Sequence, residues 1–132
     1  MTRPLLLDTH VALWAVTGSE SLSAQGKAAI LSADEVFVSV ASVWEIAIKH
    51  SLGKGGMPVS SSLALTAFRD AGFTLLGIKS EHVVHVEQLP KIHRDPFDRL
   101  LVAQALLEPL TLLTCDATVG LYSNAIVVLQ GR

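Results

Sequence analysis

The sequence is poor in cysteine and contains no long apolar run. Cys115 is the single cysteine in 132 residues, which excludes an intrachain disulfide and a cysteine-rich zinc site and is typical of a reducing cytoplasm. Half of the residues are hydrophobic, yet charged residues interrupt every apolar run well before the roughly 18 residues that a membrane span needs. The run that begins at Leu5 meets Asp8 at once and is too short for a signal peptide. We therefore expect a soluble, cytoplasmic protein.

An excess of basic charge is also missing. Ten basic residues stand against twelve acidic residues, and the net charge of −2 excludes the strongly basic proteins that coat nucleic acids. Any nucleic-acid site must therefore be local. Neither a G-x-S-x-G elbow nor a G-x-x-x-x-G-K-[ST] loop occurs, so serine-hydrolase and nucleotide-binding functions have no support. No repeat or long linker divides the chain, and we expect one domain over residues 1–132.

Short apolar runs of β type alternate with helical patterns. The expected strands are residues 4–7, 35–40, 73–78, 110–113 and 125–129. The expected helices lie near residues 10–17, 23–33, 41–52, 61–71, 80–88 and 96–107, and the loop 52–58 follows the third helix with several glycines and a proline. This alternation predicts an α/β fold with a mostly parallel sheet of about five strands, covered by helices on both faces.

Carboxylates stand where a parallel sheet places its ligand crevice, beyond the C-terminal ends of the strands. Asp8 ends the block LLLD and Asp116 ends the block LLTCD, each after an apolar run. The simpler interpretation is that each caps the helix that follows it. Glu45 shares a narrow polar stripe with Ser42 and Lys49 on an otherwise apolar helix. Here the simpler interpretation is a solvated stripe with an i, i+4 ion pair.

The stretch HRDPFDRLLVAQA, residues 93–105, contains two aspartates with different tasks. Asp95 suits the N-cap of a helix that starts at Pro96, where the missing N–H of proline costs nothing. Asp98 shares a helix face with Leu101 and two further apolar residues. A carboxylate at the head of an apolar stripe is costly to bury unless it is paired or binds a cation. We therefore predict that Asp98 has a function.

Together the four carboxylates Asp8, Glu45, Asp98 and Asp116 form a candidate metal site. If they converge, their mutual repulsion would raise their pKa values unless a hard divalent cation neutralises them. Oxygen ligands of this kind suit Mg²⁺ or Mn²⁺. Such an ion activates water and offsets charge on a phosphodiester, so an acidic protein could cleave an acidic polymer.

Four blocks of the sequence carry a family resemblance. In their order and spacing, LLLDTHVALW, SVWEIAIKHSLGK, LPKIHRDPFDRLLVAQA and LLTCD resemble the PIN-domain family, specifically the VapC-type ribonuclease toxins of bacterial type II toxin–antitoxin pairs. The resemblance covers nearly the whole chain. It implies a three-layer α/β/α sandwich, endonucleolytic RNA cleavage dependent on Mg²⁺ or Mn²⁺, a homodimer, and a cognate antitoxin that covers the active site.

The resemblance also assigns site residues. It carries over Asp8, Glu45, Asp98 and Asp116 as the site acids, Thr9 as a supporting hydroxyl, and Asp95 as a motif residue outside the metal site, while Cys115 departs from the family pattern. We expect Asp8 and Asp98 to hold the principal metal directly and Glu45 to bind it through water or orient the attacking water. Asp116 would hold a second metal or a water. Hydrolysis by metal-activated water would leave a 5′-phosphate and a 3′-hydroxyl.

Basic residues near these motifs are candidates for contacts to RNA phosphates, although a solvated surface charge is the simpler interpretation of each. The candidates are Lys49, Lys54, Lys91, Arg94 and Arg99. Arg94 and Arg99 are favoured because they flank Asp98.

Three other functions stay open at this point. A metal-independent ribonuclease could use one of five histidines and would leave a 2′,3′-cyclic phosphate; the candidates are His10, His50, His82, His85 and His93. A zinc site from His82 and His85 lacks further ligands. A receiver-type phosphoacceptor domain would need adjacent acids after the first strand, a mid-chain acceptor aspartate and a late lysine, which this sequence lacks. A PIN-fold interaction module without catalysis would not require all four acids.

Overall fold

The computed structural model describes residues 3–53 and 57–130. Within these ranges a five-stranded sheet consists of β1 (Leu5–Leu7), β2 (Val36–Ser39), β3 (Thr74–Leu76), β4 (Thr111–Thr114) and β5 (Val127–Val128). The strand order is β3-β2-β1-β4-β5, and all neighbouring strands are parallel. The predicted α/β fold with a parallel sheet is confirmed.

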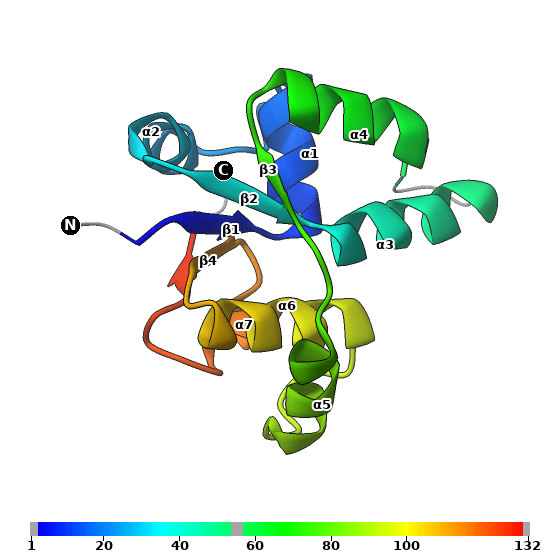
Figure 1. Ribbon diagram of the computed structural model, residues 1–132. Coiled ribbons are helices and arrows are strands. Elements are labelled where there is room, and N and C mark those ends of the chain that lie inside the picture. The colour runs from blue at the N-terminus through cyan, green and yellow to red at the C-terminus, as the bar shows by residue number, and fades with distance from the viewer. Residues whose placement is uncertain (1–2, 54–56, 131–132) are drawn as a thin grey trace.

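Helices cover both faces of this sheet (Figure 1). They are α1 (Thr9–Thr17), α2 (Ala24–Ser32), α3 (Val40–Ser51), α4 (Ser61–Asp70), α5 (Ser80–Gln88), α6 (Pro96–Leu107) and α7 (Ala117–Gly120). Figure 1 shows α1, α2 and α4 on one side of the strands and α5, α6 and α7 on the other, which confirms the three-layer sandwich. Helix α7 is not predicted from the sequence, because four residues are too few to display a helical period.

Two apolar cores, one on each face of the sheet, hold the layers together. Successive residues of a strand point to opposite faces, so Leu5 and Leu7 join the core that includes α1, while Leu6 joins the core that includes α6. All three leucines are buried. Burial of each such side chain contributes about 1.5–3 kcal/mol. The central strand is therefore fixed from both faces.

The parallel register brings the C-terminal ends of the strands to one edge of the sheet. Leu7 of β1 lies opposite Val38 of β2 and Leu113 of β4. Asp8 directly follows β1, and Asp116 comes two residues after β4. This edge is therefore where the two predicted acids that follow strands, Asp8 and Asp116, come together.

Two sequence expectations concern parts of the chain away from this edge. Leu52 forms the C-cap of α3 at the start of the predicted loop, and residues 54–56 of that loop lie outside the described residues. No helix in the described part of the chain combines the length and the apolar character needed to cross a membrane.

Candidate active site

Asp8 stands at the C-terminal end of β1 and has two hydrogen-bonding tasks. Its Oδ1 accepts the backbone N–H of Val11 at 2.8 Å, which makes Asp8 the N-cap of α1. Its Oδ2 accepts the hydroxyl of Thr114 at 2.6 Å, from the end of the neighbouring strand β4. Burial raises the pKa of Asp8, and the hydrogen bonds from Thr114 and Val11 oppose that rise. The cap thus fixes a half-buried carboxylate at the sheet edge.

Glu45 is buried on α3, with only 3% of its surface exposed. The hydroxyl Oγ1 of Thr9 lies 2.6 Å from Oε1 of Glu45 and 2.9 Å from Oγ of Ser42, which is also buried. The ammonium of Lys49 lies 2.5 Å from Oε2 of Glu45. The ion pair of the sequence interpretation is confirmed, but the solvated stripe is wrong, because Ser42 and Glu45 face the protein interior.

Asp98 lies in the first turn of α6, where burial raises its pKa to about 7. The negative charges of Asp95, Asp8 and Glu45 add to this rise, and His93 opposes it. These charges act on Asp98 through space, so the carboxylates share one region of the protein. An ionised Asp98 therefore requires compensation by positive charge at neutral pH.

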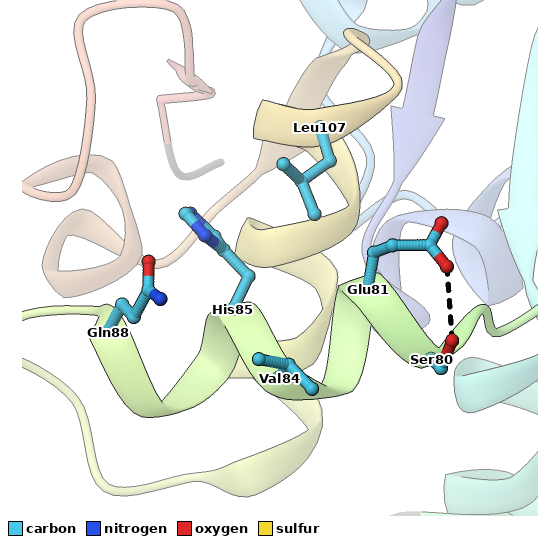
Figure 2. Close-up of a pocket in the computed structure, with 6 residues that line it drawn as sticks. All are labelled: Ser80, Glu81, Val84, His85, Gln88 and Leu107. Atoms are coloured by element: carbon cyan, nitrogen blue, oxygen red, sulfur yellow. Dashed lines mark hydrogen bonds between the residues drawn. The ribbon is translucent and has the colours of Figure 1, made fainter.

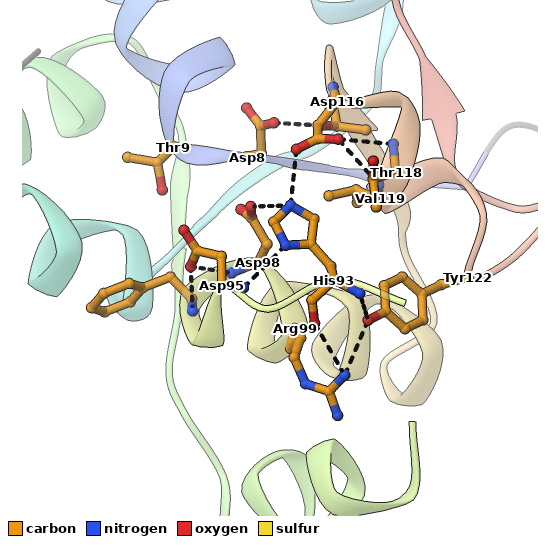
Figure 3. A network of polar contacts seen from close by, with 12 residues as sticks. Asp8, Thr9, His93, Asp95, Asp98, Arg99, Asp116, Thr118, Val119 and Tyr122 are labelled. Atoms are coloured by element: carbon orange, nitrogen blue, oxygen red, sulfur yellow. Dashed lines mark hydrogen bonds and ion pairs between the residues drawn. The ribbon is translucent and has the colours of Figure 1, made fainter. Parts of the chain in front are cut away.

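Asp116 is the N-cap of the short helix α7 and accepts hydrogen bonds on both oxygens. Its Oδ1 accepts the backbone N–H groups of Thr118 at 2.8 Å and of Val119 at 3.4 Å. Its Oδ2 lies 3.0 Å from Nε2 of His93, and the same nitrogen lies 3.3 Å from Oδ2 of Asp98. Burial acts to raise the pKa of Asp116, but the hydrogen bonds outweigh burial and lower it. Figure 3 shows His93 beside the carboxylates of Asp98 and Asp116.

Asp95 caps α6, as the sequence predicts. Its Oδ1 accepts the backbone N–H groups of Phe97 at 2.8 Å and of Asp98 at 3.2 Å, and Pro96 occupies the start of the helix. The backbone N–H of Asp95 itself donates to Nδ1 of His93 at 3.0 Å. One residue therefore orients both the helix that carries Asp98 and the imidazole beside it.

The four acids predicted from the sequence gather at the C-terminal edge of the sheet. Their donor set consists of carboxylate oxygens, which Mg²⁺ and Mn²⁺ prefer. The raised pKa values of Asp8 and Asp98 indicate a deficit of positive charge that a cation would correct. Among the described residues, His93, Asp98 and Asp116 place possible ligand atoms within 4.8 Å of one another. The residues present therefore fit a divalent cation.

The basic residues proposed for RNA contacts differ in their surroundings. Arg99 donates from its guanidinium to three backbone carbonyls and to the hydroxyl of Tyr122, at 2.9 to 3.4 Å, and so secures the segment that precedes α6. Lys49 is engaged by Glu45. The remaining candidates are the exposed Lys91 and Arg94, and Lys54, which lies outside the described residues.

The zinc alternative finds no support in the part of the chain that the structure describes. His82 is buried and places Nε2 2.7 Å from Oε2 of Glu108, a contact that joins α5 to the end of α6. Among the residues 3–53 and 57–130, neither His82 nor His85 belongs to a group that could hold a metal ion. His82 therefore serves the structure of the helix pair.

A hollow of about 360 Å³ lies on the surface formed by α5 and α6 (Figure 2). Its lining consists of Ser80, Glu81, Val84, His85, Gln88 and Leu107. The hydroxyl of Ser80 donates to Glu81 at 3.0 Å, and the side chain of Val84 is 63% exposed. None of the predicted acids lines this hollow, so it is separate from the candidate site.

Three contributors to the site are not predicted in these roles. Thr114 binds Asp8, Tyr122 binds the backbone N–H of His93 at 2.8 Å, and His93 itself contacts two acids. A threonine at the end of an apolar strand and a histidine two residues before a helix cap are weak signals in a single sequence. Cys115, which departs from the family pattern, packs against the core that includes α1. Burial, followed by the charge of Asp8, raises the pKa of its thiol.

Comparison with known proteins gives one family and several similar folds. The family model described as PIN domain matches residues 5–122. No curated protein matches the chain. The crystal structure of VapBC2 from Rickettsia felis, bound to a DNA fragment from their promoter, contains a chain with TM-score 0.68 and 11% identity, covering 98% of this chain and 99% of that one.

Two further structures have the same fold at low sequence identity. A toxin–antitoxin complex from Klebsiella pneumoniae gives a TM-score of 0.66 at 16% identity, covering 94% of this chain and 96% of the other. FitAcB from Neisseria gonorrhoeae gives a TM-score of 0.64 at 18% identity, covering 95% of this chain and 96% of the other. At such identities the likeness concerns the fold.

Proposed function

The chain belongs to the PIN-domain family, and from that premise we propose that it is a divalent-metal-dependent endoribonuclease and the toxin of a toxin–antitoxin pair. The observation that carries the proposal is the gathering of Asp8, Glu45, Asp98 and Asp116 at one sheet edge, with the pKa of Asp98 raised to about 7. The similar folds of VapBC2 and of the toxin–antitoxin complex from Klebsiella pneumoniae support the choice of protein class.

Each acid is proposed to have its own task. When bound, Mg²⁺ or Mn²⁺ lowers the pKa of a water molecule and offsets negative charge on the phosphate. Asp8 and Asp98 would hold the principal ion directly, because the raised pKa values of these half-buried acids show that their charges need compensation most. Asp116, which contacts the same Nε2 of His93 as Asp98 does, would hold a second ion or a water.

Glu45 is the acid best placed to orient the attacking water. Thr9 and Lys49 fix one oxygen each of its carboxylate, so the side chain keeps one rotamer. Hydrolysis then leaves a 5′-phosphate and a 3′-hydroxyl. A cyclic phosphate product would instead support catalysis by a histidine.

The direct test is cleavage of single-stranded RNA by the purified protein with Mg²⁺ or Mn²⁺. We expect EDTA to abolish cleavage and Asp98→Asn to lower the rate by about 100-fold or more, the order of loss for one electrostatic group in an active site. Asp70→Asn is the matched control, because Asp70 is exposed at the end of α4 and should keep the parental rate. Cleavage that survives EDTA, or a parental rate in Asp98→Asn, would contradict the proposal.

An apolar ridge on α3 supports the proposal of an antitoxin partner. Val40, Trp44, Ile48 and Leu52 recur every four residues and are 41, 55, 36 and 64% exposed. These four residues are called the α3 ridge below. Its length is about 18 Å at a rise of about 1.5 Å per residue, enough to receive an apolar segment of another protein.

The α3 ridge borders the acids. The ring of Trp44 meets that of Phe97 edge to face with centroids 5.0 Å apart, and these two aromatics directly precede Glu45 and Asp98 in the sequence. A partner seated on the ridge would therefore also cover the site. The homodimer that the resemblance implies stays a prediction, and the mass of the purified chain in solution tests it.

A further inference from the structure

We propose that His93 is a positioning residue, which sets the carboxylates of Asp98 and Asp116 for metal binding without binding the metal itself. This inference rests on the proposed metal-dependent function and adds a residue to it. Three features of the structure carry it: the place of the imidazole between the acids, its tautomer, and the attachment of its backbone.

The imidazole of His93 joins two acids that belong to different elements. Its Nε2 lies 3.0 Å from Oδ2 of Asp116, the cap of α7, and 3.3 Å from Oδ2 of Asp98 in α6. Two carboxylates this close repel each other, and a donor placed between them offsets the repulsion. The ring therefore holds together two ligands that would otherwise move apart in the absence of a cation.

The tautomer of His93 decides whether this residue positions the acids or binds the metal. The backbone N–H of Asp95 donates to Nδ1 at 3.0 Å, so Nδ1 carries a lone pair and the ring hydrogen is on Nε2. A histidine binds a metal through the lone pair of the ligating nitrogen, and here the nitrogen that faces the acids carries a hydrogen instead. His93, Asp98 and Asp116 have the spacing of a three-ligand metal site, but the hydrogen-bond pattern assigns the imidazole the role of donor.

The backbone of His93 is held as firmly as its ring. Its N–H donates to the hydroxyl of Tyr122 at 2.8 Å, and Arg99 donates to the same hydroxyl at 3.1 Å (Figure 3). Arg99 also donates to the carbonyls of Val86 at 2.9 Å and Pro90 at 3.0 Å. These contacts leave the imidazole one position, which a positioning role requires.

Two substitutions of His93 distinguish the roles of its two ring nitrogens. In His93→Asn the amide oxygen takes the place of Nδ1 and can accept the N–H of Asp95, but the side chain is too short to reach the acids. In His93→Gln the amide N–H takes the place of Nε2–H and can reach Asp98 and Asp116. The probe is Mn²⁺ alone, titrated into each purified protein by calorimetry, with the unfolding temperature as a check on folding.

We expect His93→Asn to weaken Mn²⁺ binding about 10- to 100-fold, the usual effect of removing a group that orders metal ligands, and His93→Gln to recover most of the affinity. In ¹⁵N NMR spectra of the unmodified protein, we expect Nε2 of His93 to carry its hydrogen both before and after addition of Mg²⁺. This measurement needs no variant and so does not depend on how the variants fold.

Three outcomes would overturn the inference in distinguishable ways. Parental Mn²⁺ affinity in His93→Asn would show that the acids need no positioning, and loss of the Nε2 hydrogen on Mg²⁺ binding would make His93 a ligand. Either result would leave the proposed function intact. Absence of Mn²⁺ binding by the unmodified protein would remove the proposed function, and this inference with it.

Discussion

At the scale of single residues, two of the acids combine a structural and a chemical task on different oxygens. Asp8 caps α1 with Oδ1 and turns Oδ2 to Thr114, and Asp116 caps α7 with Oδ1 and turns Oδ2 to His93. In each case the backbone N–H groups of the cap hold one carboxylate oxygen and a side chain holds the other, so the plane of the carboxylate is fixed. A cap and a metal ligand are therefore compatible interpretations of the same aspartate.

Asp98 makes stability depend on pH in a predictable direction. Its pKa is about 7 in the folded protein and 3.8 ordinarily. Between about pH 4 and pH 7 the folded chain keeps a proton that the unfolded chain has released, so the free energy of unfolding of the metal-free protein falls as the pH rises. Urea unfolding measured across this window, with and without Mg²⁺, checks the direction.

The control for this prediction is Asp98→Asn, which removes the titrating group and should flatten the slope. Asp8, whose pKa is also raised by burial, would leave a residual slope of the same sign. Mg²⁺ competes with the proton, so its protection should be greater at about pH 8 than at about pH 6. A slope of opposite sign, or one unchanged in Asp98→Asn, would contradict the assignment.

At the scale of elements, the start of α6 decides how Asp98 is presented. The sequence predicts a helix over residues 96–107, and the observed bounds are identical. The start agrees because Asp95 and Pro96 give an unambiguous signal. By contrast, β5 has two residues where five are predicted, and Val127 within it is 37% exposed, so the apolar run specifies neither the pairing nor the burial of each of its residues. Strong local signals thus predict bounds, and weak ones predict only the existence of an element.

Loss of the α6 cap should affect stability and activity together. We expect Asp95→Ala to lower the free energy of unfolding by about 1 kcal/mol and to weaken RNA cleavage, because the cap orients Asp98. Asp95→Asn keeps a capping oxygen and should retain both. Urea unfolding and cleavage rates measure the two effects.

The matched control for the cap is Ser60→Ala at the N-terminus of α4, where Ser60 accepts the N–H of Leu63. Ser60→Ala should lower the free energy of unfolding by a similar amount and leave the rate of RNA cleavage unchanged. If Asp95→Ala and Ser60→Ala alter cleavage equally, the effect is one of general stability and the cap has no special part in the site.

At the scale of the whole molecule, topology explains why the sequence predicts the acids better than their neighbours. A parallel sheet collects its strand ends at one edge, so the sequence predicts that Asp8 and Asp116, which each follow a strand, lie at the same edge. That β1 and β4 are neighbours, which brings the two acids together, is a finding of the structure. The contacts of His93 and Tyr122 depend on how the irregular segment before α6 meets the end of α7. An irregular segment has no hydrophobic periodicity from which its contacts could be predicted, so only the folded structure reveals them.

Part of the high apolar content of the chain is exposed to solvent in the α3 ridge. If the ridge receives the antitoxin, a charge on it should release the toxin without harming the fold. Expression of the protein should arrest growth, Asp98→Ala should relieve the arrest, and coexpression of the antitoxin should do the same. We expect Leu52→Glu to arrest growth even with the antitoxin present, because Leu52 is 64% exposed and its replacement costs little stability.

Leu31→Glu is the matched control for the ridge, since Leu31 is 86% exposed on α2 and lies outside the ridge. It should arrest growth alone and be neutralised by the antitoxin, as the unmodified chain is. Neutralisation of Leu52→Glu to the same degree would place the partner elsewhere on the molecule. Arrest by Asp98→Ala would mean that the chain acts by sequestering a partner, because the acids would then be dispensable for the phenotype while the surface is retained.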